Sequence, residues 1–169
     1  MPYKLSQTDP ALAKGDVNGD GFDDVYLGGA YGQAGTFLMS DTKGGFSPKT
    51  FPDFVKDAHY EDVAATFLDA DGDGNLDLYV GSGSYEFDIN GENLIGRLYM
   101  NDGAGNFTRD MKRLPEIPQA VGVVAAADFD NDGDGDKDIV AGNWGLNSKH
   151  KASTDYPFHV YAKDFNSTL

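Results

Sequence analysis

Three short stretches of the chain place carboxylates at alternating positions around glycines, and this spacing suits the binding of a metal ion. Each stretch follows the nine-residue pattern D-x-(D/N)-x-D-G-x-x-D, where x is any residue. The three stretches begin at Asp16, Asp69 and Asp130. Carboxylates this close repel one another, whereas a divalent cation between them turns the repulsion into attraction. Oxygen ligands alone favour a hard cation such as Ca²⁺, which takes about six to eight oxygens. We therefore expect about three Ca²⁺ ions, one in each acidic loop.

The expected ligands of each ion are the side chains at loop positions 1, 3, 5 and 9 and the main-chain carbonyl at position 7. The glycine at position 6 lets the chain turn sharply, so that the flanking carboxylates converge. The predicted metal ligands are Asp16, Asn18, Asp20, Phe22 and Asp24 in the first loop, Asp69, Asp71, Asp73, Asn75 and Asp77 in the second, and Asp130, Asp132, Asp134, Asp136 and Asp138 in the third.

The third acidic loop can be read in two registers. A loop that starts at Asp128 would use Asp128, Asp130, Asp132 and Asp136 as its ligands. We prefer the start at Asp130, because only this register places the apolar run IVAG where the other two loops are followed by VYLG and LYVG.

An EF-hand loop begins in the same way but has a bidentate Glu at position 12 and a helix on either side. Position 12 is Leu27, Val80 and Ala141 in the three loops, and no helical pattern flanks them. The EF-hand is therefore excluded, and we interpret each acidic loop as the connection of a β-hairpin.

The elements that position these loops follow from a second recurring pattern. The segments TFLMSDTKGGFS (36–47) and RLYMNDGAGNFT (97–108) each read as two strands joined by a tight turn of Asp, Asn and Gly. Each repeat is then strand, acidic loop, strand, longer loop, strand, turn, strand. The only helical signal is a turn or two within 53–62. The pattern predicts an all-β fold made of β-propeller blades of four antiparallel strands.

The chain contains about three such repeats, at about 11–52, 63–112 and 121–163, and a fourth begins over 158–169. We interpret residues 1–169 as a single propeller segment. Because a closed ring takes about four to eight blades, we expect an incomplete arc of a larger propeller. An open arc leaves strand edges uncovered, which favours self-association.

The charge of the chain excludes several classes of partner. The net charge is −15, with 28 acidic residues against 13 Lys and Arg, and the pI is about 4.2. Nucleic-acid binding depends on basic residues that neutralise phosphates, so we expect no nucleic-acid partner. No apolar run approaches the roughly 20 residues of a membrane helix, so we expect no membrane insertion.

The acidic repeats GDVNGDGFDDVYLGGA, LDADGDGNLDLYVGSG and DFDNDGDGDKDIVAGNWGLNS, together with the hairpin RLYMNDGAGNF, resemble FG-GAP/VCBS repeats. These repeats form the propellers of integrin α-subunits and occur in secreted bacterial proteins. The segments GGAYGQAG and GNWGLNSKHKAS are also similar to bacterial relatives of the acidic secreted cartilage proteins with an ASPIC/UnbV region. Literal FG-GAP residues are absent, the nearest being LGGA at 27–30, so the integrin mode of ligand binding does not carry over.

The resemblance implies a propeller that is usually seven-bladed, binds Ca²⁺ in its hairpin loops, is exported, and acts in adhesion or ligand binding. We therefore expect an extracellular, cell-surface or periplasmic interaction scaffold rather than an enzyme, with an unidentified protein or glycan ligand. The alternative is part of a calcium-dependent propeller enzyme that acts on polysaccharide, in the manner of a lyase. That alternative requires a concave pocket that holds Arg97 or lysines beside a Tyr or His. A third hypothesis is an element that assembles when calcium orders it.

Overall fold

The computed structural model describes residues 10–83, 92–114, 116, 121–127 and 138–143. These residues form ten short strands, one short α-helix and one 3-10 turn, and every strand pairing is antiparallel. The predicted all-β fold is confirmed. No helix in these ranges has the length and apolar character needed to cross a membrane.

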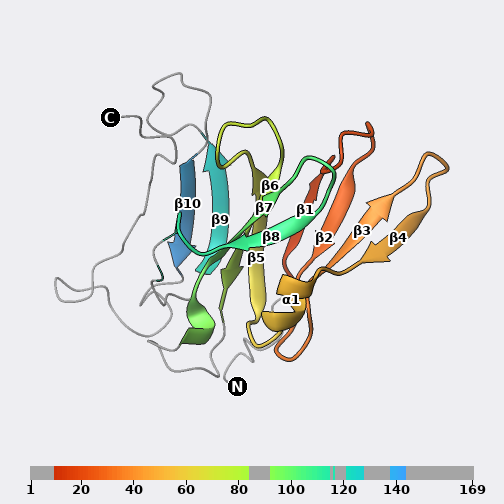
Figure 1. Cartoon of the computed structure of the whole chain (residues 1–169). Helices are drawn as coiled ribbons and strands as arrows, with labels where there is room; N and C mark the ends of the chain where they lie inside the picture. Colours follow the sequence, from red (N-terminus) through yellow and green to blue (C-terminus); the bar gives the residue numbers. More distant parts are fainter. Residues whose placement is uncertain (1–9, 84–91, 115, 117–120, 128–137, 144–169) are drawn as a thin grey trace, which may run out of the picture.

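The strands form three sheets that stand side by side (Figure 1). In the two four-stranded sheets each strand pairs with its neighbour in the chain. The first sheet contains β1 (Leu12–Gly15), β2 (Asp24–Leu27), β3 (Thr36–Ser40) and β4 (Phe46–Lys49), and the second contains β5 (Asp62–Leu68), β6 (Asp77–Ser82), β7 (Arg97–Asn101) and β8 (Phe107–Asp110). The third contains β9 (Val121–Ala127) and β10 (Asp138–Asn143). The helix α1 (Pro52–Lys56) joins the first sheet to the second, and the turn η2 (Glu92–Leu94) precedes β7.

The two complete sheets have the strand order expected of propeller blades. Their acidic loops join β1 to β2 and β5 to β6, as the repeat pattern predicts. The helix α1 falls where the sequence showed its one helical signal. The bounds of the three repeats stay a prediction. The end of the third repeat and the start of a fourth at 158–169 lie outside the described residues.

Tight turns close the outer hairpin of each four-stranded sheet. In the β7–β8 turn the carboxylate of Asp102 accepts hydrogen bonds from the main-chain N–H groups of Ala104 and Asn106. Asp41 holds the β3–β4 turn in the same way. Gly44 and Gly103 adopt φ values of +78° in these turns, a conformation that costs glycine least. Both hairpins predicted from the sequence are therefore present.

The first and second sheets pack face to face through aromatic side chains. Phe37 of β3 stacks on Phe107 of β8 with ring centroids 4.5 Å apart. Phe54 of α1 stacks on Tyr99 of β7 at 4.0 Å and also contacts Tyr26 of β2. All five side chains are buried. Burying an aromatic side chain contributes a few kcal/mol, so this layer accounts for much of the adhesion between the two sheets.

The second and third sheets pack through a smaller, mainly aliphatic core. Leu68, Tyr79 and Leu98 of the second sheet meet Ile139 and Val124 of the third. Side chains alternate between the two faces of a strand, so the second sheet uses one face for each neighbour.

The aromatic layer predicts a large effect of removing one central ring. Phe37→Ala should lower the free energy of unfolding by about 3 to 5 kcal/mol, because the ring is fully buried and its removal leaves a cavity. Phe46→Ala, which truncates a ring that is 55% exposed, serves as the matched control and should change it by less than about 1 kcal/mol. Urea unfolding followed by circular dichroism measures both. Equal losses for the two variants would contradict the packing described.

Candidate metal centre

The second acidic loop is organised by the carboxylate of Asp69, which follows the end of β5. Its Oδ1 accepts a hydrogen bond from the N–H of Gly72 at 2.8 Å, and its Oδ2 accepts one from the N–H of Gly74 at 2.8 Å. Both glycines have positive φ values, 76° and 85°. The chain therefore wraps around this one carboxylate, which explains why the sequence alternates Asp and Gly here.

Asp77, at position 9 of the same loop, opens β6 and is fully buried. Its Oδ2 accepts from the N–H of Ala70 at 2.9 Å and its Oδ1 accepts from the N–H of Asn101 at 2.7 Å. Burial raises the pKa of Asp77, the two hydrogen bonds lower it, and the nearby charges of Asp71 and Asp73 raise it. The net result is a pKa of about 6. Each of these charges adds to the free-energy cost of ionising Asp77, and a bound cation would offset that cost.

Three of the five ligands predicted in this loop converge. Asp69, Asp71 and Asp77 each offer a carboxylate oxygen within 4.8 Å of the others. The Oδ1 of Asp71 is buried and has no hydrogen-bond partner among the described residues. Asp73 instead accepts hydrogen bonds from both nitrogens of Asn75, at 2.8 and 2.7 Å. The arrangement can hold a hard cation between the three carboxylates.

The first acidic loop repeats this construction. Asp16 accepts hydrogen bonds from the N–H groups of Gly19 and Gly21, both at 2.8 Å. These bonds lower the pKa of Asp16 although burial acts in the opposite direction. Asn18 donates to Asp20 at 3.1 Å. Phe22 donates its own N–H to Asp20 at 2.9 Å.

Asp24 takes the place in the first loop that Asp77 has in the second. It is fully buried and accepts from the N–H of Val17 at 3.3 Å and from the N–H of Ser40 at 2.8 Å. Position 3 is an amide here, Asn18, so the first loop offers one carboxylate fewer than the second.

The third acidic loop lies outside the described residues, and with it the predicted ligands Asp130, Asp132, Asp134 and Asp136 and the choice between starts at Asp128 and Asp130. Asp138 is the first residue of β10, and its main chain pairs with that of Ala127. This position matches that of Asp24 and Asp77 at the starts of β2 and β6.

An arginine near the second loop had no signal in the sequence. Arg113 follows β8, and its guanidinium lies 3.3 Å from Asp71 and 2.8 Å from Asp110. It comes 42 residues after Asp71, and no repeat or spacing links the two. Its positive charge partly offsets the acidic cluster at one edge.

Sequence reasoning also missed a buried polar network at the junction of the first two sheets. Asp62 at the start of β5 forms an ion pair with Arg97 of β7, whose side chain is 2% exposed. Tyr26 donates its hydroxyl proton to Asp62 at 2.8 Å. Arg97 donates to the hydroxyl oxygen of Tyr99, which in turn donates to Asp57 at 2.7 Å. The network thus joins both sheets and the segment after α1.

Burial and charge set the ionisation of this network. Burial raises the pKa of Tyr26 and Tyr99, and the carboxylates that they face raise it further. Burial by itself would lower the pKa of Arg97, but its neighbours raise it on balance. The tyrosines therefore stay neutral donors and Arg97 stays charged, as its buried ion pair with Asp62 requires.

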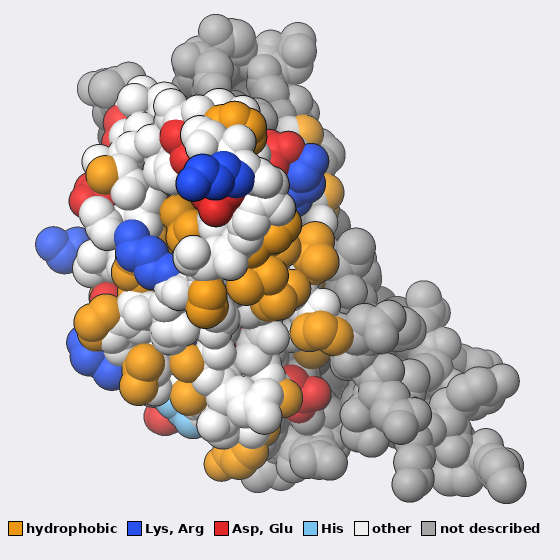
Figure 2. Space-filling model, turned by 90° about the vertical axis from the view of Figure 1, so that its right-hand side faces the viewer, with side chains coloured by type: hydrophobic (Ala, Val, Ile, Leu, Met, Phe, Trp, Pro, Cys, Tyr) orange, Lys and Arg blue, Asp and Glu red, His pale blue; other side chains and the backbone are white. Residues whose placement is uncertain are grey.

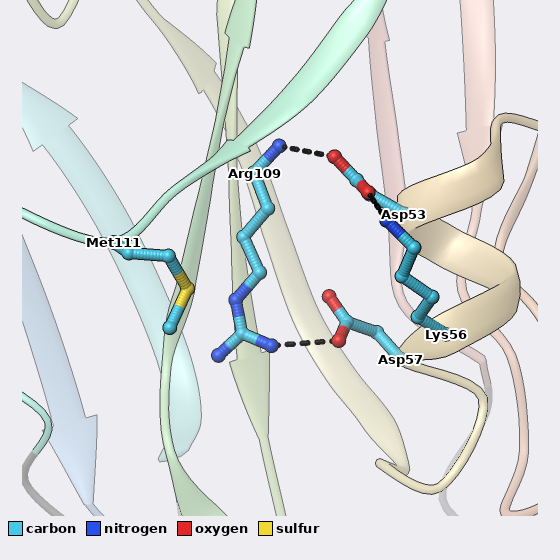
Figure 3. Close-up of a pocket in the computed structure, with 5 residues that line it drawn as sticks. All are labelled: Asp53, Lys56, Asp57, Arg109 and Met111. Carbon is cyan, nitrogen blue, oxygen red and sulfur yellow. Dashed lines mark hydrogen bonds and ion pairs between the residues drawn. The ribbon is translucent and has the colours of Figure 1, made fainter.

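A pocket of about 250 Å³ lies between α1 and β8 (Figure 3). It is lined by Asp53, Lys56, Asp57, Arg109 and Met111. Arg109 donates to Asp57 at 2.6 Å and its main-chain N–H donates to Asp53, which also pairs with Lys56. Two acids and two bases therefore compensate one another.

The lyase alternative requires a pocket that holds Arg97 or lysines beside a Tyr or His. Arg97 lies in the buried network instead, and the pocket between α1 and β8 holds Lys56 but, among the described residues, is lined by no Tyr or His. The lyase alternative stays a hypothesis.

Comparison with known proteins identifies the repeat. A family model described as an FG-GAP-like repeat matches residues 16–80, from the first acidic loop to the strand that follows the second. This confirms the resemblance to FG-GAP repeats for residues 16–80, whereas the similarity to proteins with an ASPIC/UnbV region stays a prediction. A search of curated proteins found no match.

The buried ion pair predicts a large cost for removing one partner. Asp62→Ala leaves the guanidinium of Arg97 buried without its counter-charge, and it should lower the free energy of unfolding by about 3 to 5 kcal/mol. Asp23→Ala removes an ion pair with Lys14 in which both side chains are about half exposed or more, and it should cost no more than about 1 kcal/mol. Denaturant unfolding of both variants tests this. A small loss for Asp62→Ala would show that the network does not hold the sheets together.

Proposed function

We propose that this chain, which carries an FG-GAP-like repeat over residues 16–80, is a calcium-binding β-propeller module of an exported protein. In this proposal it serves as a non-catalytic scaffold that binds a protein or a glycan. The observation that carries the calcium assignment is the convergence of Asp69, Asp71 and Asp77 on one small volume. The acidic loop of the first sheet wraps around Asp16 as the second wraps around Asp69, although among the described residues only the second loop brings three carboxylates together.

The donor set favours Ca²⁺ over other metals. The three converging groups are carboxylates, which suit hard cations, whereas zinc and copper favour nitrogen or sulfur ligands. The chain has no cysteine. Mg²⁺ demands nearly octahedral placement and keeps its waters, while Ca²⁺ accepts irregular oxygen cages. A loop whose flexible turns depend on glycine at positions 4 and 6 suits the larger ion.

The metal would act on the structure rather than on a substrate. Asp77 connects the acidic loop to the end of β7 through the N–H of Asn101. The amide of Asn101 then donates to the carbonyl of Val17 in the first acidic loop at 2.7 Å and to that of Leu76 in the second at 3.0 Å. A cation that fixes the second loop would therefore also fix the junction between the two sheets.

We assign the binding of a partner to the connections at the ends of the strands that lie opposite the acidic loops, because function on a rigid sheet tends to lie on its loops. Two long polar and aromatic connections in the sequence, 82–96 and 143–157, are the candidates, and they fall mainly outside the described residues. Export belongs to the proposal because a structural calcium site needs the ion at high free concentration. Extracellular calcium modules bind at about 10⁻⁴ to 10⁻³ M, which suits the free calcium outside a cell.

Calcium should raise the stability of the chain specifically. A site filled at one hundred times its dissociation constant adds about 2.7 kcal/mol to the free energy of unfolding. The melting temperature measured with calcium should exceed that measured with EDTA, and magnesium should raise it less. Calorimetric titration should give about three ions per chain if all three loops fill. An unchanged melting temperature with calcium would overturn the assignment.

Single substitutions locate the ions. Asp71→Asn removes one of the three converging carboxylates and should weaken calcium binding in the second loop at least tenfold. Asp102→Asn, in the turn between β7 and β8, changes charge equally at a site where no metal is proposed, and it should leave the titration unchanged. Equal effects of the two variants would mean that calcium responds to overall charge and not to the acidic loop.

A further inference from the structure

Arg113 places a positive charge beside the candidate metal centre of the second acidic loop. Its guanidinium nitrogen Nη2 lies 3.3 Å from Oδ2 of Asp71, which is one of the three converging carboxylates. The other carboxylate oxygen of Asp71, Oδ1, is buried and has no hydrogen-bond partner among the described residues. A cation in the loop and the guanidinium of Arg113 would therefore be neighbours across one carboxylate.

The guanidinium is anchored by Asp110 at the end of β8. Nη1 of Arg113 lies 2.8 Å from Oδ2 of Asp110, whose Oδ1 accepts hydrogen bonds from the main-chain N–H groups of Lys112 and Arg113 at 2.8 and 2.7 Å. Charge-assisted hydrogen bonds between N–H groups and carboxylates are usually about 2.7 to 2.9 Å long. The contact with Asp110 has this length, whereas the contact with Asp71 is longer. Loss of the contact with Asp71 would therefore leave the guanidinium in place beside the loop.

The first repeat has neither the extra carboxylate nor the guanidinium. Position 3 of its acidic loop is the neutral Asn18, where the second loop has Asp71. When the two repeats are aligned on the first residue of the fourth strand, Arg113 corresponds to Pro52. The additional negative charge and a positive charge next to it thus occur together in the second repeat.

Acidic and basic side chains of this chain pair locally elsewhere too. Lys14 of β1 lies 2.5 Å from Asp23, and Lys56 of α1 lies 2.6 Å from Asp53. Figure 2, which views the molecule from the side of the first sheet, shows basic side chains beside acidic ones. Both lysine side chains are more than 60% exposed, so solvent screens them, whereas that of Arg113 is 34% exposed. The charge of Arg113 therefore acts more strongly on its neighbours.

We propose that Arg113 is a counter-cation built into the second acidic loop, which stabilises the converging carboxylates without calcium and weakens the binding of calcium by repulsion. The inference rests on the proposed function, because it requires that this loop binds calcium. A guanidinium one carboxylate away repels a divalent cation, and at a partly exposed site the repulsion should weaken binding about three- to tenfold. Arg113 thus sets the second loop to fill at a higher calcium concentration than its carboxylates alone would.

Removal of the charge tests the proposal. Arg113→Gln should tighten calcium binding to the second loop about three- to tenfold and leave that of the first loop unchanged. Lys112→Gln removes the same charge from the neighbouring exposed residue and should leave both loops unchanged. Arg113→Lys keeps the charge without the planar guanidinium and should bind calcium as the original chain does.

Amide NMR signals report on each loop separately during a calcium titration over about 10⁻⁵ to 10⁻² M, which brackets the affinity of extracellular calcium modules. The N–H groups of Gly72 and Gly74 donate to the first carboxylate of the second loop, and those of Gly19 and Gly21 donate to that of the first loop. The signals of these four glycines therefore give one binding curve for each loop.

The outcomes separate this inference from the proposed function. If the second loop of the original chain binds calcium and Arg113→Gln binds it equally or more weakly, the inference is overturned and the proposed function stands. An equal gain in affinity for Lys112→Gln would also overturn the inference. If none of the four glycine signals of the original chain responds to calcium, the proposed function is overturned and the inference falls with it.

Stability without calcium gives an independent measurement. In EDTA, Arg113→Gln should lower the melting temperature by about 2 to 4 °C, because the carboxylates lose their counter-charge. Saturating calcium should reduce this loss at least by half, and high salt, which screens the charges, should reduce it as well. An equal loss in EDTA and in calcium would show that Arg113 acts only through its contact with Asp110, and it would overturn the proposal.

Discussion

A buried carboxylate at the start of the second strand holds each of the first two sheets together. Asp24 and Asp77 are fully buried, and each accepts one hydrogen bond from its own acidic loop and one from the end of the third strand, at Ser40 and Asn101. A buried charge costs several kcal/mol unless it is hydrogen-bonded or paired. The loop conformation and the strand register must therefore be correct together, because either error would leave the carboxylate without its donors.

The centre and one edge of the junction between the first and second sheets use different chemistry. Aromatic rings such as Phe37 and Phe107 fill its centre, where shape and apolar area decide the packing. At one edge the ion pair of Asp62 and Arg97 requires donors and acceptors in fixed positions. The apolar centre supplies most of the free energy of packing. The polar edge favours one angle between the sheets, since a different angle would leave a buried charge without its partner.

The fold could be predicted from the sequence because its signals are local and repeated. Asp and Gly at fixed offsets determine the loops and turns, and their recurrence identifies the repeats. The same reasoning grouped Asp69, Asp71 and Asp77 as neighbours, which they are. It could not find the network around Arg97 or the contact of Arg113 with Asp71, since these join residues about 35 to 42 positions apart through packing that no periodic pattern records.

The pairing of every strand with its neighbour in the chain has a consequence for how the protein forms. A sheet such as β1–β4 spans fewer than forty residues, and all its strand-to-strand pairings lie within that stretch. Contacts between residues close in sequence form quickly, because little loop entropy is lost. The first sheet can thus assemble while later repeats are still being synthesised, and it then offers the nascent second sheet a template on which to condense.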